Sequence, residues 1–226
     1  MVDYTTILFQ VLDIISIVIC FLALISVYFQ WKESKNPLDI SLMILVGILF
    51  ASIIMQFTNS LIDAYAPATE QVPQIGYMSV LELLYLLTGF VYSWFIFYML
   101  DWKRMYAIPL VVSFFAALFY AEHNIREPYL YFNMLAMVIS VVVLFYKAFK
   151  NRNAVAFAIA LCGAFFLTHA IIRNYMGITH LRQIFAIIGV GSVILAENGW
   201  FDEHLFYDKK ERKKVQNVWV SRVIAK

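Results

Sequence analysis

The sequence predicts an all-α, polytopic membrane protein with seven transmembrane helices, its N-terminus outside and its C-terminus in the cytoplasm. Hydrophobic residues make up 63% of the 226 residues and charged residues 14%, whereas soluble proteins average roughly 45–50% and about 25%. The apolar residues gather into seven runs, each close to the ~20 residues that a helix needs to cross a bilayer. Lys and Arg are also distributed unequally between the connections. These three observations predict the fold class, the number of spans and the orientation.

The seven apolar runs leave only short connections between them. They do not alternate apolar and polar residues in segments of roughly ten, as the strands of a membrane barrel do. The first run follows MVDY, which has no basic residue, and it contains Asp13. We therefore interpret it as a retained helix rather than a cleaved signal peptide. The expected helices cover residues 5–30, 40–62, 76–100, 105–120, 129–149, 154–175 and 178–198.

The orientation follows from the positions of the basic residues. Fourteen of the 17 Lys and Arg residues lie in the tail and in one set of connections, and only Arg126, Arg173 and Arg182 lie in the other set. Basic loops remain on the cytoplasmic side, and an odd number of spans then places the N-terminus outside. We expect residues 1–198 to form the transmembrane domain of an integral protein of the cell membrane. The net charge of +2 reflects this topology and attraction to lipid headgroups, not nucleic-acid binding.

Residues 199–226 are expected to form a basic, amphipathic cytoplasmic tail. Val215, Val218, Trp219 and Val223 recur at helical spacing beside the run KKERKK. This pattern is typical of a helix that lies on anionic lipids of the inner leaflet. Docking to a protein partner on the cytoplasmic side is the alternative interpretation.

Polar residues occur at comparable depth in the outer third of at least five of the expected helices. Buried ionisable residues in membranes generally face the bundle interior, pair with one another and mark function. Three acids, Asp13, Asp63 and Glu82, have possible partners among the bases on the last two helices. We therefore predict an outward-facing polar cavity whose ligand-binding residues are Asp13, Gln56, Asn59, Asp63, Glu82, His169, Arg173, Arg182 and Gln183.

Two structural interpretations compete with this binding site. Arg173, His180 and Arg182 are close enough to the interface to extend into the headgroups. Asp13, Glu82 and His169 lie deeper, where either structural pairing or ligand, ion or proton chemistry accounts for them. The sequence leaves both interpretations open.

The sequence contains no pattern that indicates a catalytic residue, a metal site or a cofactor. It has neither a nucleophile motif nor an HExxH zinc motif. Cys20 and Cys162 fall near the middle of apolar helices, which indicates buried, unreactive thiols. The helix number and length resemble those of retinal proteins, but the expected last helix, LRQIFAIIGVGSVILAENG, contains no lysine to form the Schiff base. We therefore exclude a retinal protein.

The helix layout over residues 5–198, and the stretch GYMSVLELLYLLTGFVYSWFIFYMLDWKR, resemble the seven-helix membrane sensor modules of some prokaryotic histidine kinases. In this stretch a polar residue near the outer surface leads into an aromatic-rich helix. The sequence contains no kinase or other output domain, so the resemblance implies signalling through a separate partner. No functional residue is carried over from that family.

The resulting function hypothesis is a receptor-like or sensor-like module that binds a small ligand, ion or proton and signals through its tail or a partner. A small transporter or channel is one alternative, although ionisable residues are almost absent from the inner part of the helices. A non-catalytic subunit of a membrane complex is the other. Enzyme activity ranks last.

Overall fold

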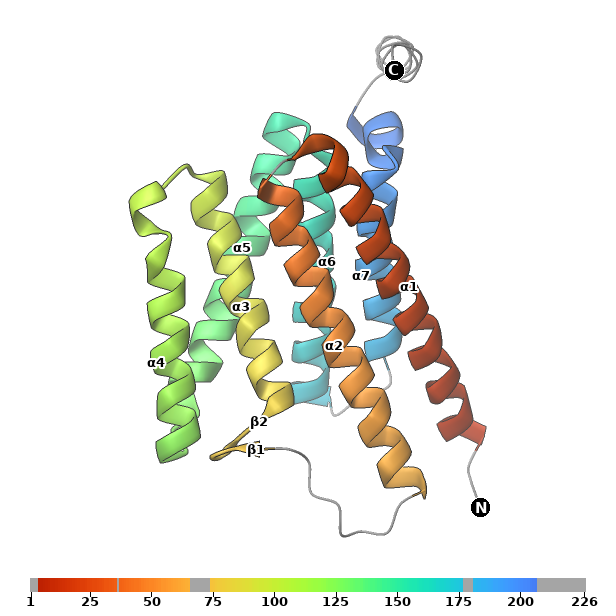
Figure 1. Ribbon diagram of the computed structural model, residues 1–226, viewed down its shortest axis with the longest axis vertical. Coiled ribbons are helices and arrows are strands. Elements are labelled where there is room, and N and C mark those ends of the chain that lie inside the picture. The colour runs from red at the N-terminus through yellow and green to blue at the C-terminus, as the bar shows by residue number, and fades with distance from the viewer. Residues whose placement is uncertain (1–3, 36, 66–73, 177–180, 207–226) are drawn as a thin grey trace.

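The computed structural model describes residues 4–35, 37–65, 74–176 and 181–206. Almost all of this part of the chain is helical, as the sequence predicts, and seven α-helices follow one another along it (Figure 1). Their bounds are Tyr4–Ser34 (α1), Pro37–Tyr65 (α2), Val80–Met99 (α3), Ala107–His123 (α4), Glu127–Asn151 (α5), Ala154–Met176 (α6) and Arg182–Glu197 (α7).

Four short elements complete the described part of the chain. Two strands, Gln74–Ile75 (β1) and Met78–Ser79 (β2), precede α3, and a 3₁₀ turn, Lys103–Met105 (η1), precedes α4. A π-helical turn, Asp202–Phe206 (η2), follows α7. The Gly199 backbone has a φ of +73°, and this left-handed residue separates α7 from the segment that leads to η2.

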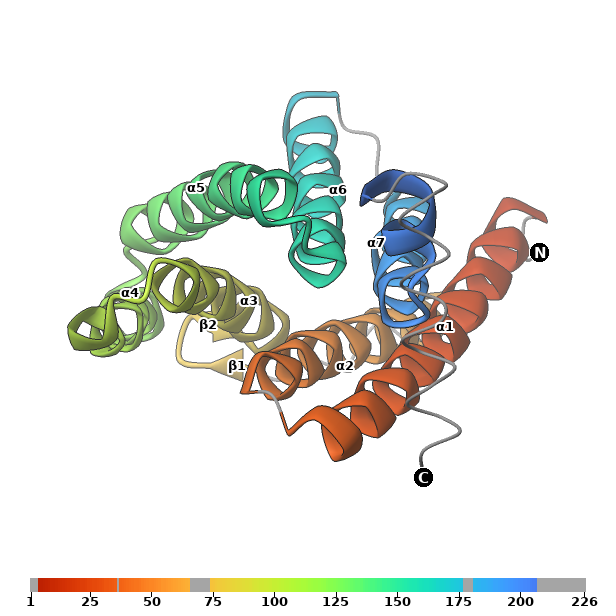
Figure 2. The same cartoon turned by 90° about the horizontal axis from the view of Figure 1, so that it is seen from above.

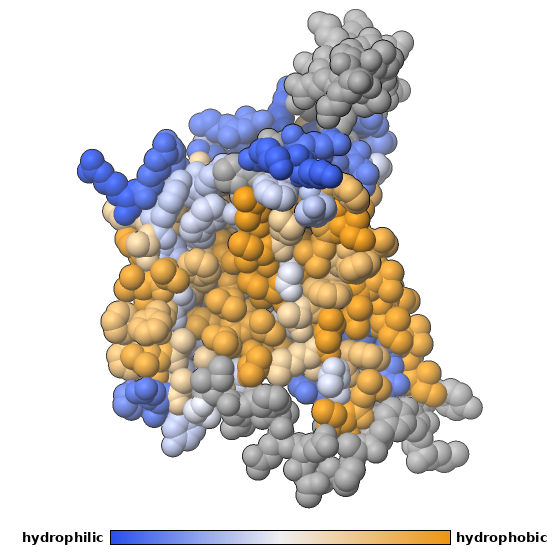
Figure 3. All heavy atoms as spheres, viewed as in Figure 1, coloured by the Kyte–Doolittle hydropathy of each residue, from blue (hydrophilic) through white to orange (hydrophobic). Residues whose placement is uncertain are grey.

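Five of the helical segments are long and apolar enough to cross a membrane. They are Ile7–Glu33, Asp39–Ile62, Val80–Met99, Lys103–His123 and Glu127–Asn151. Their surface is apolar as well: Phe114 on α4 is 60% exposed and Val142 on α5 is 63% exposed. Figure 3 shows an apolar band across the middle of the visible face, with hydrophilic residues gathered at its two ends. A band of this extent on exposed helices suggests that the protein is inserted in a lipid bilayer.

Consecutive helices lie side by side and point in opposite directions. Each helix contacts the next in the sequence, and α7 contacts α1, so the series closes on itself (Figure 2). Helix α3 also contacts α5, and α4 lies outside this pair. Because the helices alternate in direction, α1, α3, α5 and α7 all begin at the same end of the bundle, called here the N-terminal end (Figure 1).

The main core lies among all the helices except α4, and small residues allow close packing there. Ala158, Ala160 and Cys162 on α6 are at most 1% exposed, and Ala186 and Val190 on α7 are similarly buried. Small side chains let helix backbones approach one another in a membrane, where no hydrophobic force drives helix association. A second, smaller core forms between β2, α3, α4 and α5; it consists of Met78, Leu86, Ala116, Tyr120 and Tyr129.

The start of α3 differs from the sequence prediction. The apolar run begins at Gly76, but residues 74–79 form a β-hairpin in which Ile75 pairs with Met78. Gly76 has a φ of +60°, and a Cβ atom there would lie 2.0 Å from the carbonyl oxygen of Ala121 on α4. Only glycine fits this turn, which the Tyr77 amide fastens to the same carbonyl at 3.0 Å. The hairpin therefore holds the start of α3 against the end of α4.

Candidate functional site

Three helices meet at a level defined by Cys20, Tyr92 and Cys162. The Tyr92 hydroxyl donates a hydrogen bond of 3.1 Å to the carbonyl of Ile159, three residues before Cys162 on α6. Cys20 on α1 belongs to the same buried core as Tyr92 and Cys162. An added Cβ on Gly189 of α7 would lie 3.4 Å from Cys162. Helices α1, α3, α6 and α7 therefore share one depth at this level.

Seven residues toward the N-terminal end, α1, α3 and α6 each carry a polar residue. Seven residues are close to two helical turns, so they return to the same face about 10 Å further along the axis. This step leads from Cys20 to Asp13 on α1, from Tyr92 to Tyr85 on α3, and from Cys162 to His169 on α6. On α7, Gln183 lies six residues before Gly189, at a comparable depth of about 9 Å along the axis but on a different face of the helix.

A direct hydrogen bond between α2 and α3 places a residue of α2 at the same depth. The amide nitrogen Nε2 of Gln56 donates to the Tyr85 hydroxyl at 2.6 Å. We call Asp13, Gln56, Tyr85, His169 and Gln183 the polar layer. Four of these residues, on four different helices, were predicted from the sequence as ligand-binding, and counting along the helices puts them at comparable depth.

Burial is deepest at three members of the polar layer. Asp13 is 2% exposed, Gln183 6% and Gln56 9%. The side-chain oxygens Oε1 of Gln56 and Gln183 are buried and have no hydrogen-bond partner within the described structure. A buried polar atom without a partner costs about 1–3 kcal/mol, and such an atom in a folded protein calls for an explanation such as a bound water or ligand.

His169 connects the polar layer to the packing between α6 and α7. Its ring lies 6.4 Å from that of Phe185, measured between centroids, and Phe185 stacks on Phe165 at 5.7 Å. One turn from Asp13, the Nε2 atom of Gln10 is also buried without a hydrogen-bond partner within the described residues. Hydrogen-bonding capacity is therefore left over on α1, α2 and α7.

Glu82 belongs to a different polar cluster. Its carboxylate accepts hydrogen bonds from Tyr120 at 2.6 Å and Arg126 at 2.7 Å through one oxygen. The other oxygen accepts from the Ser79 amide and hydroxyl, each at 2.9 Å. The hydrogen bond that Arg126 donates to Glu82 raises the pKa of Arg126, so this guanidinium stays charged. Glu82 thus ties the start of α3 to α4 and to the residue before α5.

The base that pairs with Glu82 differs from the partners considered in the sequence. Those candidates were on the last two helices, whereas Arg126 lies in the connection between α4 and α5. The remaining predicted site residues are not shown to join either polar cluster. Asn59 lies on α2 one turn beyond Gln56 and is partly exposed. The side chains of Asp63, Arg173 and Arg182 lie outside the described residues, although their helices are described.

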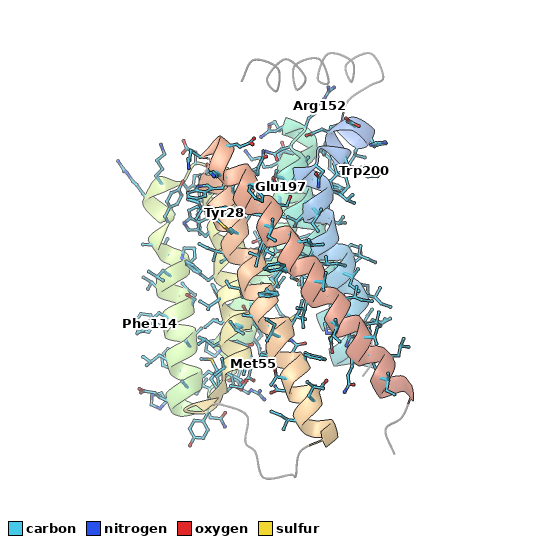
Figure 4. The ribbon with its side chains drawn as sticks, turned by 45° about the vertical axis from the view of Figure 1, so that its right-hand side comes forward. Tyr28, Met55, Phe114, Arg152, Glu197 and Trp200 are labelled. Atoms are coloured by element: carbon cyan, nitrogen blue, oxygen red, sulfur yellow. The ribbon has the colours of Figure 1, made fainter. Side chains whose placement is uncertain are left out.

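A pair of acids lies at the opposite end of the bundle. Asp39, in the first turn of α2, is 4% exposed and interacts electrostatically with Glu197 at the end of α7. The Oε1 atom of Glu197 is buried without a hydrogen-bond partner among the residues described. Figure 4 shows Glu197 at the upper end of α7, beside α1. The sequence analysis gave neither acid a role in a site.

One of the two missed contacts has a signal in the sequence. The residues from Ser79 to Glu82 match the S-x-x-E capping box, and the structure contains both of its hydrogen bonds. That motif indicates that Glu82 lies in the first turn of a helix and that its carboxylate bonds to the backbone of the N-cap residue. Tyr85 lies one turn after Glu82, but its bond with Gln56 depends on how α2 packs against α3 and has no local signal.

The chemistry available in the polar layer is hydrogen bonding and charge. An acid, an imidazole, a phenol and two amides surround this depth, and both amide oxygens have spare acceptor capacity. In the described part of the chain, no three His, Cys, Asp or Glu side chains lie close enough together to hold a metal ion. The arrangement favours recognition of a small polar molecule or ion.

Comparison with known proteins assigns no family to this arrangement. The chain matches no family model, no curated protein and no solved structure. The resemblance in layout to seven-helix sensor modules remains a prediction from the sequence.

Proposed function

We propose that the protein is a receptor-like or sensor-like integral membrane protein in which the polar layer binds a small polar ligand or ion. All seven helices cross the cell membrane in this proposal, with the N-terminal end of the bundle outside. The polar layer then lies in the outer half of the membrane. Ligand binding there changes the packing of α6 and α7, and the basic tail or a protein partner receives that change on the cytoplasmic side.

The observation that carries the proposal is the buried amide oxygen of Gln183. This side chain is 6% exposed, yet its Oε1 atom has no hydrogen-bond partner among the described groups. A helix that only needed to pack would favour an apolar residue here, because apolar packing avoids the penalty of an unsatisfied buried atom. Polar residues kept inside a membrane bundle are usually functional.

The positions of α6 and α7 support a relay between the two sides. Helix α7 carries Gln183 near its beginning and Glu197 at its end, 14 residues later, which corresponds to about 21 Å. It packs on both α1 and α6, which contribute Asp13 and His169. A ligand that binds Gln183 therefore contacts the same helix that carries Glu197, the partner of Asp39 in the acidic pair.

Native mass spectrometry tests the proposal on full-length protein gently extracted from its own membrane. The expected spectrum contains an added small mass, which is lost in Gln183→Leu and in Gln56→Leu. Thr88→Val is the matched control, because Thr88 is 4% exposed but its hydroxyl is already bonded to the Leu84 carbonyl at 3.0 Å. This control should retain the added mass.

Two other spectra contradict the proposal. A protein without any added mass means that the polar layer is a structural feature of the bundle. A second protein at fixed stoichiometry, released by the polar-layer variants, means that the layer serves assembly and that the chain is a subunit of a membrane complex.

A further inference from the structure

A groove on the surface of the bundle lies between α1, α6 and α7. Its volume is about 500 Å³, which is within the range of roughly 300–1,000 Å³ for small-molecule sites. Most of its lining comes from one face of α7. Residues that define its floor and walls are Ile19, Leu161, Ile187, Gly191, Ser192 and Phe201.

The walls of this groove offer hydrocarbon surface and almost no free polar atom. The one hydroxyl among them, on Ser192, already lies 2.6 Å from the Gly189 carbonyl and 3.3 Å from the Ala158 carbonyl. Gly191 leaves the middle of the groove open, because a Cβ atom there would meet nothing within 4 Å. An occupant must therefore be apolar.

The groove extends through the depth that hydrocarbon occupies in a bilayer. On α7 it lies between Gln183 and Glu197, and two residues that line it, Ile188 and Leu195, are 45% and 42% exposed. Exposed isoleucine and leucine on a membrane-inserted helix face lipid chains rather than water. Linear hydrocarbon is consequently the medium in contact with the groove.

The end of the groove near η2 reaches headgroup depth. Phe201 lines it there, and the adjacent Trp200 is 45% exposed and stacks on His204 with ring centroids 4.6 Å apart. Figure 4 shows Trp200 at the same end of the bundle as Glu197. Tryptophan is enriched at the boundary between headgroups and hydrocarbon. The groove thus runs along α7 and ends beside the stacked rings of Trp200 and His204 at headgroup depth.

We propose that this groove binds one acyl chain of a phospholipid from the leaflet on the η2 side, with the headgroup beside Trp200 and His204. The proposal depends on insertion in a bilayer but not on a ligand in the polar layer. A groove shaped for one chain holds that chain longer than the surrounding surface does, because the lipid contacts three helices instead of one.

Photo-crosslinking in defined vesicles tests this proposal. Full-length protein is reconstituted into vesicles of palmitoyl-oleoyl phosphatidylcholine containing a phosphatidylcholine with a diazirine in its acyl chain, and labelled residues are mapped by mass spectrometry. We expect labelling at Leu161 and Ile187 to be at least fivefold stronger than around Phe114, which lies on the outward face of α4 and is 60% exposed. Figure 4 shows Phe114 pointing away from the bundle.

Filling the groove should remove this preference. Gly191→Phe is expected to lower labelling of the groove at least fivefold. Ile184→Phe, at a position 42% exposed on the same helix, should leave it unchanged. Gly191→Leu provides a smaller filling residue in case the larger one disturbs folding, and it should give the same loss.

Two results would overturn the lipid site. Labelling of the groove equal to that around Phe114 indicates ordinary surrounding lipid. The same labelling in Gly191→Phe, Gly191→Leu and Ile184→Phe indicates that the groove does not hold the chain.

Discussion

Gln56 and Tyr85 join α2 to α3 through a hydrogen bond of 2.6 Å, in which the amide nitrogen of Gln56 donates to the tyrosine hydroxyl. Tyr85 lies seven residues from Tyr92, whose hydroxyl contacts the Ile159 carbonyl on α6. Two tyrosines two turns apart on α3 thus fix the depth of α2 and α6 relative to each other. This relationship places the polar layer about 10 Å from the level of the two cysteines.

Removing the acceptor of this bond should be more damaging than removing both partners. Tyr85→Phe leaves the buried Nε2 atom of Gln56 without its acceptor, and we expect a loss of about 1–3 kcal/mol in the free energy of unfolding. In Tyr85→Phe combined with Gln56→Leu the loss should be smaller, because no donor is left unsatisfied. Denaturation of all four proteins in the same detergent measures this coupling; additive losses would contradict the bond.

In the cluster around Glu82, we expect loss of the neutral partner to lower the stability of the protein more than loss of the charged partner. Arg126 is an exposed partner, with 58% of its side chain accessible, so Arg126→Gln should cost only about 0–1 kcal/mol. Tyr120 is 2% exposed, and its hydroxyl bonds to the carboxylate. We expect Tyr120→Phe to cost about 1.5–3 kcal/mol. Thermal unfolding that ranks these two variants in the opposite order would contradict this assignment.

Close packing at Gly163 predicts a specific steric effect. A Cβ there would lie 2.8 Å from Val141 and 2.9 Å from the Tyr92 ring, and Tyr92 is fully buried. Gly163→Ala should therefore destabilise the protein by about 1–3 kcal/mol. Gly47→Ala is the control, because nothing lies within 4 Å of its new Cβ, and alanine favours the helix by about 1 kcal/mol. Equal unfolding temperatures for the two variants would argue against this packing.

The proposed orientation predicts opposite accessibility at the two ends of the bundle. Tyr77 in the hairpin is 60% exposed, and 77% of the Lys103 side chain is exposed at the other end. In intact cells, a membrane-impermeant thiol reagent should label Tyr77→Cys but not Lys103→Cys. Both native cysteines are buried, so the unmodified protein provides the background. Labelling of Lys103→Cys alone would reverse the orientation.

Composition was enough to predict the helical architecture, because long apolar runs leave few alternatives in a bilayer. The helix ends were harder to predict. The chain stays helical through Ser34 in α1 although its last residues are polar, since hydropathy marks the membrane core and not the end of a helix. At Gly76 the apolar character continues through a hairpin whose reason is a contact with Ala121, 45 residues away.

The candidate site was predictable as a set of residue types but not as a set of contacts. Asp13, Gln56, His169 and Gln183 are conspicuous because polar side chains are rare in apolar helices. Which of them share a depth depends on helix packing, for which the sequence contains no local signal. Arg126 is a second example. Its charge helped to predict the topology, but its bond to Glu82, 44 residues away, depends on the packing of α3, α4 and α5 and could not be predicted.

The central claim is that Gln183 and the polar layer hold a small polar molecule or ion. An experimental density map of the protein, extracted with its native lipids into a nanodisc, tests this claim most directly. Our account predicts non-protein density within hydrogen-bonding distance of the Gln183 amide and level with Asp13 and Gln56, and absent from Gln183→Leu. A Gln183 amide bonded to protein groups alone, in a layer closed by side chains, would contradict it.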